Sequence, residues 1–227
     1  MTASGQFDQV RKNTHSLSQS SITGANKMKT FLMIFIPALI ILLIFILVPG
    51  YFGLFYRINI VEKTVGPFTI LYEKHVGDYR GAGAVSDRLY YELLDEHHIE
   101  CKKGFGIYYD KPGETETEKL RCITGNILED VDAGKLAELE KKYTIKVFPE
   151  TKAVYSEFPF KSTGEKGSGK MFIVMSLMRT YPALEKYLQE KNYPRTPIME
   201  IYDVPGQKIS YITAVNLDPA VLDGFLD

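Results

Sequence analysis

The longest apolar stretch of the chain spans residues 30–56 and contains no charged side chain. A bilayer's hydrocarbon core is about 30 Å thick and is crossed by roughly 20 apolar residues of helix. The pattern therefore predicts one transmembrane helix over 30–56. The apolar part of a signal peptide is shorter, about 7 to 15 residues, and a small-residue cleavage site follows it. No such site follows this stretch, so we expect an uncleaved anchor of a single-pass membrane protein.

Residues 1–29 are polar, and we expect them to be either a disordered tail or a segment upstream of a true start at Met28. Lysines and arginines flank the apolar stretch on both sides. Their distribution leaves open which side of the membrane the remainder of the chain faces.

Beyond this stretch, apolar positions alternate in two segments and recur at helical spacing in two others. Alternation predicts a strand, and apolar residues at i, i+3 and i+4 predict a helix with one buried face. Strand 68–75 is followed by helix 84–97, and strand 152–158 by helix 170–191. We expect Pro182 to break or restart the second helix, because proline cannot donate a hydrogen bond to the preceding turn.

A hairpin motif follows each predicted helix. Tyr109-Asp-Lys-Pro-Gly113 matches Tyr202-Asp-Val-Pro-Gly206, and a β-branched strand comes after each turn. An aromatic strand, a Pro-Gly turn and a second strand together predict a β-hairpin. If residues pair about the first turn, Tyr108 lies opposite Cys122. Cys101 then lies too far along the partner strand for a disulfide.

The two series of elements predict an α+β domain made of duplicated β-α-β-β units, with an antiparallel sheet and pseudo-twofold symmetry, preceded by one transmembrane helix. A segment rich in Lys and Glu, residues 130–143, is expected to be a helical surface connection between the units. The junction of two half-domains is a preferred place for a ligand cleft.

The charge of the soluble part argues against one class of partner. Four of the 27 Lys and Arg residues and one of the 28 Asp and Glu residues precede Arg57, so the remainder carries a net charge of −4. Both signs are interspersed and no basic run occurs. Proteins that bind a phosphate backbone carry a basic patch, so we expect no nucleic acid partner.

Two motifs resemble cofactor sites but lack essential parts. Gly164–Lys170 has the spacing of a phosphate-binding loop, but Met171 stands where Ser or Thr would hold Mg²⁺. His97, His98 and Cys101 have no second ligand pair at zinc-finger spacing, so a helix end with basic residues is expected there. The sequence predicts no metal and no cofactor.

Aromatic residues on or near the predicted strands are the strongest indication of a ligand site. A tyrosine offers a large apolar body and a hydroxyl that can satisfy a polar group of a ligand. The candidate ligand-binding residues are Tyr72, Tyr109, Tyr155, Glu200 and Tyr202. The carboxylates nearest to the expected cleft are those of Glu73, Glu157 and Glu200. Because strand carboxylates ordinarily face solvent, we expect all three to be exposed, and no catalytic residue is assigned.

Several segments in combination resemble the gyrase-inhibitor-like (GyrI-like) family of small-molecule-binding domains. The order of elements, the Tyr-Asp-x-Pro stretch and Met199–Tyr202 carry the resemblance to the family. The segments similar to one branch of it are Gly50–Leu54, Gly106–Asp110, Lys119–Cys122, Lys146–Phe148 and Tyr181–Leu184. The resemblance covers residues 66–216, with 217–227 as a C-terminal tail, and is closest to a membrane-anchored branch that includes an ER-phagy receptor. Family members that bind cations or hydrolyse electrophiles carry a glutamate in the last strand, where this chain has Ser210. The resemblance therefore argues against those two activities.

The sequence thus predicts a membrane-anchored domain that binds a small apolar or amphiphilic molecule. Two alternatives stay open. One is a hydrolase of electrophilic small molecules that uses a Glu and Tyr pair in the cleft, with the Glu as general base. The other is a membrane-bound adaptor that docks a protein partner. A buried carboxylate in the cleft favours the enzyme, and a cleft filled by the protein's own aromatic side chains favours the adaptor.

Overall fold

The structure is a computed structural model that describes residue 29, residues 31–162 and residues 169–227. Our expectations for the N-terminal tail up to residue 28 and for the glycine-rich loop at 164–168 lie outside the described residues. The chain divides into two compact units, with the boundary between Tyr51 and Phe52.

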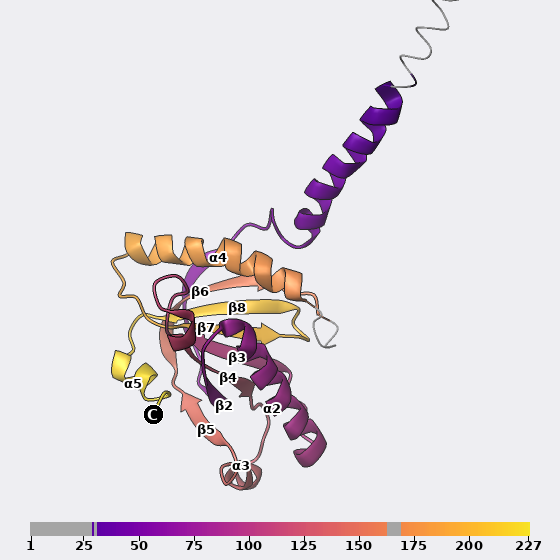
Figure 1. Cartoon of the computed structure of the whole chain (residues 1–227). Helices are drawn as coiled ribbons and strands as arrows, with labels where there is room; N and C mark the ends of the chain where they lie inside the picture. Colours follow the sequence, from indigo (N-terminus) through magenta and orange to yellow (C-terminus); the bar gives the residue numbers. More distant parts are fainter. Residues whose placement is uncertain (1–28, 30, 163–168) are drawn as a thin grey trace, which may run out of the picture. The chain divides into compact units, whose positions relative to one another are not determined.

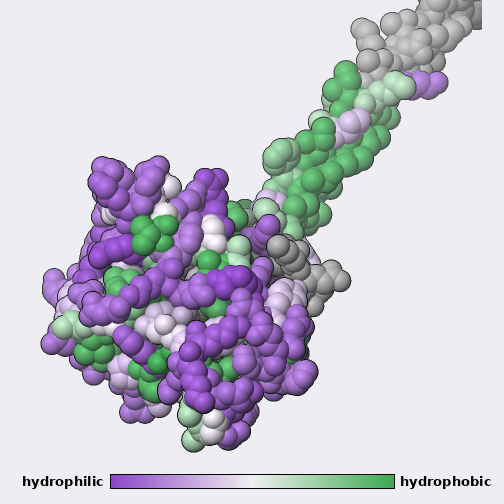
Figure 2. Space-filling model, turned by 60° about the horizontal axis from the view of Figure 1, so that its bottom comes forward, coloured by the Kyte–Doolittle hydropathy of each residue, from purple (hydrophilic) through white to green (hydrophobic). Residues whose placement is uncertain are grey.

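The first unit contains the helix Phe31–Tyr51, whose 21 residues make it long and apolar enough to cross a membrane. It is the single helix of this kind among the described residues, and the face of it seen in Figure 2 is mainly hydrophobic. A signal sequence near an N-terminus passes the same test of length and composition. The helix continues through Pro49 and ends at Tyr51, one residue beyond the Pro-Gly pair.

Within its described residues, the second unit contains one antiparallel sheet of eight strands (Figure 1). The order across the sheet is β1-β6-β8-β7-β3-β4-β2-β5. The strands are β1 Ile60–Val65, β2 Phe68–Val76, β3 Lys103–Tyr108, β4 Arg121–Ile127, β5 Thr144–Phe148, β6 Thr151–Pro159, β7 Ile198–Asp203 and β8 Lys208–Ala214. The α+β class and the antiparallel sheet are therefore confirmed.

The helices of this unit are α2 Ala82–His97, α3 Ala133–Leu139, α4 Lys170–Glu190 and α5 Pro219–Asp223. Short 3₁₀ turns occupy Tyr79–Gly81 and Thr117–Lys119. The expected break at Pro182 is wrong, because α4 runs through it without interruption. Pro182 is exposed, so water can satisfy the carbonyl that loses its helical donor there.

The two halves of the sheet have the same strand arrangement. β2 pairs with β4 and β4 with β3 in one half, and β6 pairs with β8 and β8 with β7 in the other. β3 and β7 then pair at the centre and join the halves. The predicted register of the first hairpin is confirmed, since Tyr108 lies opposite Cys122. Superposition of the two halves by a half-turn rotation stays a prediction.

Both faces of the sheet are covered. On one face, α2 packs against β2 through Leu89 and Leu93, and α4 packs against β6 and β8 through Phe172 and Leu184. On the other face, the C-terminal segment covers a second apolar cluster through Leu222 and Phe225. Alternate residues of each central strand therefore enter different cores. We call the first the helix face and the second the C-terminal face.

Candidate functional site

Strand β7 carries a buried carboxylate at the centre of the sheet. Met199 and Ile201 point to the C-terminal face, so strand alternation directs Glu200 and Tyr202 to the helix face. Glu200 pairs with Gly106 on one side and Tyr211 on the other, and it is 1% exposed. The expectation that Glu200 faces solvent is therefore wrong. The reason is that helix packing encloses this side of the sheet.

Two tyrosine hydroxyls bind the Glu200 carboxyl group. The hydroxyl of Tyr181, on α4, donates to Oε1 at 2.6 Å, and the hydroxyl of Tyr202 donates to Oε2. A third ring, that of Tyr211 on β8, lies edge-on to Tyr181 at 5.9 Å between centroids and donates to Ser176 Oγ at 2.5 Å. These interactions bring together residues from β7, β8 and α4. We call Glu200, Tyr108, Tyr181, Tyr202 and Tyr211 the Glu200 cluster.

Glycine in β3 makes room for the fifth member of the cluster. A Cβ atom on Gly106 would lie 2.9 Å from the ring of Tyr108, closer than side chains normally approach. The Tyr108 ring contacts Tyr79 edge-on, with centroids 4.9 Å apart. The small residue at position 106 therefore lets the Tyr108 ring lie over β3, beside the strand position that pairs with Glu200.

Burial controls the electrostatics of the cluster. Desolvation raises the pKa of Glu200 above its ordinary value of 4.5, and the hydrogen bonds from Tyr181 and Tyr202 oppose that shift without cancelling it. Burial, followed by the negative charge of Glu200, also raises the pKa of Tyr181 and Tyr202 well above 10. The tyrosines therefore stay neutral donors, while the Glu200 carboxyl group keeps its proton to higher pH than an exposed Glu does.

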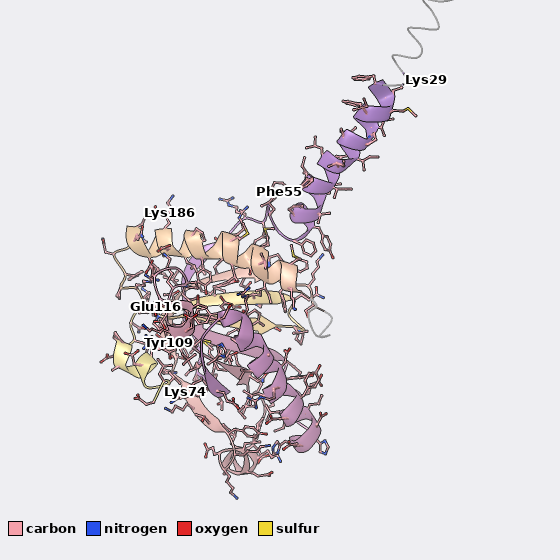
Figure 3. All side chains as sticks on the ribbon, in the orientation of Figure 1. Lys29, Phe55, Lys74, Tyr109, Glu116 and Lys186 are labelled. Atoms are coloured by element: carbon pink, nitrogen blue, oxygen red, sulfur yellow. The ribbon has the colours of Figure 1, made fainter. Side chains whose placement is uncertain are left out.

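The structure does not bring all five predicted site residues together. Glu200 and Tyr202 belong to the cluster. Tyr72 and Tyr109 lie on the C-terminal face, where their hydroxyls donate to main-chain carbonyls of the C-terminal segment at 3.0 and 2.6 Å. Figure 3 labels Tyr109 near α5. Tyr155 is 8% exposed on the same face. Ligand contact by these three tyrosines stays a prediction.

The other two carboxylates considered above do not join the cluster. Glu73 forms an ion pair with Arg88 at the surface and remains partly exposed, as expected. Glu157 accepts from Lys208 at 2.6 Å and is also partly exposed. Sequence reasoning missed Tyr181 as a site residue, because it lies on a helix and was considered only as part of a motif that resembles the family. No periodicity relates a helical position to a strand 19 residues later.

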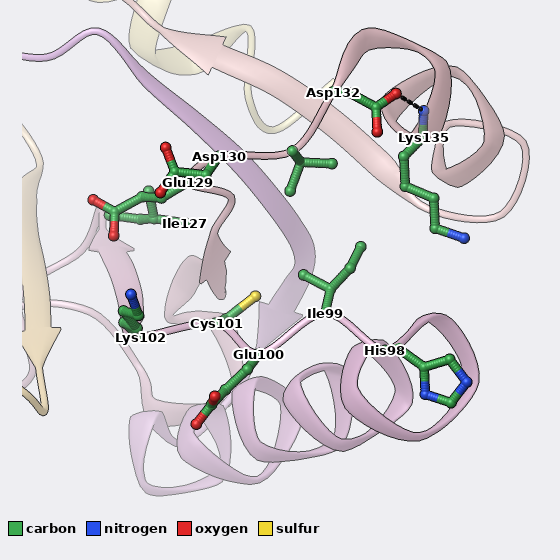
Figure 4. A pocket seen from close by; sticks show the side chains of 11 residues that line it. His98, Ile99, Glu100, Cys101, Lys102, Ile127, Glu129, Asp130, Asp132 and Lys135 are labelled. Atoms are coloured by element: carbon green, nitrogen blue, oxygen red, sulfur yellow. Dashed lines mark hydrogen bonds between the residues drawn. The ribbon is translucent and has the colours of Figure 1, made fainter.

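An open cavity of about 310 Å³ lies at another part of the domain (Figure 4). Its lining comes from the connections that follow α2 and β4 and from α3. It includes His98, Glu100, Cys101, Lys102, Glu129, Asp130, Asp132 and Lys135. Burial raises the pKa of Cys101 to about 11, so its thiol is protonated at neutral pH and a weak nucleophile. No group of three metal-ligating residues occurs in the part of the chain that the structure describes.

The family model for the "GyrI-like small molecule binding domain" matches residues 58–214. The chain therefore belongs to the GyrI-like family of small-molecule-binding domains.

Two curated relatives extend the comparison. The chain is 28% identical over 162 residues to mouse testis-expressed protein 264 homolog, covering 67% of this chain and 48% of the relative. It is 28% identical over 173 residues to human testis-expressed protein 264, covering 72% and 51%. This chain thus spans about half the length of the curated relatives it matches.

Two solved structures have folds similar to that of this chain. The EcmrR C-terminal domain has a TM-score of 0.47 at 12% identity, covering 71% of this chain and 99% of that one. SAV2435 bound to tetraphenylphosphonium has a TM-score of 0.41 at 10% identity, covering 68% and 91%.

Proposed function

We propose that this domain binds a small amphiphilic molecule on the helix face of the sheet, with the ligand's polar end at Glu200. The observation that carries the proposal is a carboxyl group 1% exposed to solvent and bound by two tyrosine hydroxyls. Burial of an ionised carboxylate is costly unless it is both hydrogen-bonded and paired with an opposite charge. Although Ser210 replaces the glutamate that cation-binding family members carry in the last strand, Glu200 on β7 offers another buried carboxylate. A protonated amine of a ligand would pair with this carboxylate, and tyrosine rings would contact the apolar body of the ligand.

The test is a thermal-shift screen of the chain in a nonionic detergent against apolar amines, neutral amphiphiles and dyes. A fragment used in parallel should begin at Phe52, because a start at Val65 would remove most of β1, whose residues pair with β6. For amine hits, we expect Glu200→Gln to weaken binding by at least about tenfold, equivalent to 1.4 kcal/mol. Tyr109→Phe, on the C-terminal face, is the comparison variant: normal binding would assign the site to the helix face, and weakened binding would support the ligand contact predicted for Tyr109. Equal binding by the Glu200→Gln variant would place the site elsewhere.

A second candidate function is hydrolysis of an electrophilic small molecule. It is favoured by the raised pKa of Glu200 next to the Tyr202 hydroxyl, because a general base works best when its pKa is close to the operating pH. The test is turnover of small epoxides and activated esters, followed by mass spectrometry. Activity that Glu200→Gln abolishes without weakening substrate binding would support catalysis. Binding without turnover would contradict hydrolysis and favour a domain that only binds its ligand.

We also propose that the helix Phe31–Tyr51 anchors the domain to a membrane. Its length and uncharged surface support this. The full chain should resist extraction by alkaline carbonate. A variant with Leu42→Lys and Ile44→Lys should be released, because each charge near the centre of a span costs about 2.5–3.5 kcal/mol on insertion scales. Release of the unaltered chain, or a mature N-terminus just after the helix, would contradict the anchor.

A further inference from the structure

The outward side of α4 is divided into an apolar half and a charged half. After Lys170 at its start, the exposed side chains of its first part are apolar, with exposed fractions of 37–67%; they are Met171, Val174, Leu177 and Met178. After Pro182, the exposed side chains are Glu185, Lys186, Gln189 and Glu190. Figure 3 shows Lys186 on the side of α4 away from the sheet. A solvent-facing helix side is normally polar throughout, so the first part has the composition of a covered surface.

The segment that follows the apolar helix is held against this part of α4. The ring of Phe52 packs edge-on against Phe172 with centroids 5.0 Å apart. The guanidinium of Arg179 donates to the carbonyls of Leu54 and, at 3.1 Å, Tyr56. Phe55, between these two residues, is 69% exposed. Residues 52–56 are therefore fixed to α4 along its apolar half.

Glycine at position 53 is required for this attachment. Gly53 has φ +95°, a conformation that L side chains rarely adopt, and a Cβ there would lie 2.5 Å from the ring of Phe158. The Tyr56 ring contacts the same Phe158 ring, with centroids 5.3 Å apart. The connection is thus docked by specific packing, and the apolar half of α4 lies beside residues that directly follow Tyr51 in the sequence.

We propose that the apolar half of α4, Met171, Val174, Leu177 and Met178, together with Phe55, inserts into the interface of a lipid bilayer. The inference rests on the proposed anchor. If Tyr51 ends the span, Phe52 starts at the membrane surface, and Phe52 already contacts α4. The charge pattern agrees, because α4 carries Lys170 and Arg179 and no acidic residue before Glu185. Interfacial helices combine an apolar side with Lys and Arg that attract anionic lipids.

The experiment uses the absence of tryptophan from the sequence. Single-tryptophan variants of the full chain, Val174→Trp, Met178→Trp, Lys186→Trp and Leu42→Trp, are reconstituted in vesicles of equal parts phosphatidylcholine and phosphatidylserine, with or without brominated acyl chains. Positions 174 and 178 report on the proposed surface. Position 186 is the matched control on the same helix, and position 42 reports on the span. We expect bromine quenching at 174 and 178 to exceed quenching at 186 by at least about threefold.

The outcomes separate this inference from the anchor. Quenching at 42 without quenching at 174 or 178 would overturn the inference and leave the anchor intact. A blue-shifted but unquenched emission at 174 would show that protein, such as a second copy, covers the surface, and would also overturn it. No quenching at 42 would contradict the anchor and the inference together. Quenching at 42, 174 and 178, with little at 186, supports both.

Discussion

Removal of the Tyr181 hydroxyl should destabilise the domain by an amount that depends on pH. Tyr181→Phe deletes the 2.6 Å hydrogen bond to Glu200 Oε1 and keeps the ring contact with Tyr211. When Glu200 is protonated, the lost bond is between neutral groups and is worth about 0.5–1.5 kcal/mol; when it is ionised, the bond is worth about 1.5–3 kcal/mol. The variant should therefore lose about 1 kcal/mol more at high pH than at low pH.

The sign follows from proton linkage. Burial raises the pKa of Glu200 in the folded chain above its ordinary value of 4.5, so the folded state binds the proton more tightly than the unfolded state. The contribution of Glu200 to stability is fully present below the unfolded pKa and is lost as pH rises through the folded pKa. Loss of the Tyr181 donor raises the folded pKa further, so the decline continues to higher pH and its total size increases.

Thermal unfolding followed by near-ultraviolet circular dichroism, at pH 4.5 and pH 8, measures the effect. For a chain of this size, 1 kcal/mol corresponds to about 2–4 °C in Tm. Tyr109→Phe is the control, because its hydroxyl donates at the same 2.6 Å distance to a main-chain carbonyl that does not titrate. If both variants show the same pH dependence as the unaltered protein, Tyr181 is not coupled to the ionisation of Glu200.

Three further predictions test packing and thiol chemistry. Gly106→Ala should lower the free energy of unfolding by about 1–3 kcal/mol, because the added methyl group would overpack against Tyr108. Gly83→Ala should raise the free energy of unfolding by up to about 1 kcal/mol, because its added methyl group meets no other atom and alanine favours the helix α2. Urea unfolding measures both changes. Tyr155→Ala should cost about 3–5 kcal/mol without any ligand, since its side chain is buried, and an unchanged denaturation midpoint would contradict this. Cys101 and Cys122, whose pKa values burial raises to about 11 and 12, should react with iodoacetamide at pH 8 only after unfolding, as mass spectrometry can show.

The elements with strong periodicity were predictable from sequence. β2, α2, β6 and α4 begin and end within two residues of the predicted ranges, because each buries one face and repeats its apolar positions regularly. The edge strands β1 and β5 were missed. They are short and carry charged residues such as Glu62, Lys63 and Lys146, which protect sheet edges and weaken the apolar pattern.

The site was less predictable because alternation tells which residues share a face but not what covers it. In this sheet both faces are covered, so the exposure of Glu200 depends on what packs over the sheet, including Tyr181 of α4, rather than on β7. In the sequence, Tyr72, Tyr109 and Tyr155 look the same as the strand tyrosines of the Glu200 cluster, because all of them lie on or near predicted strands. Only the packing of the helices and the C-terminal segment separates the two groups.

The Glu200 cluster also imposes a condition on any ligand. Glu200 is 1% exposed and both carboxyl oxygens already accept hydrogen bonds, so a ligand amine must displace a tyrosine hydroxyl to reach it. In the unbound protein, the conformation that can bind a ligand is then only a minor part of the population. The apparent affinity is reduced in proportion to the fraction of molecules in that conformation. Tyr181→Phe has no such bond to lose and should bind a cationic amphiphile more tightly, while Glu200→Gln should bind it more weakly. Isothermal titration calorimetry measures the affinity of both variants for the cationic amphiphile. If both weaken binding, Tyr181 contacts the ligand and does not cover the carboxylate.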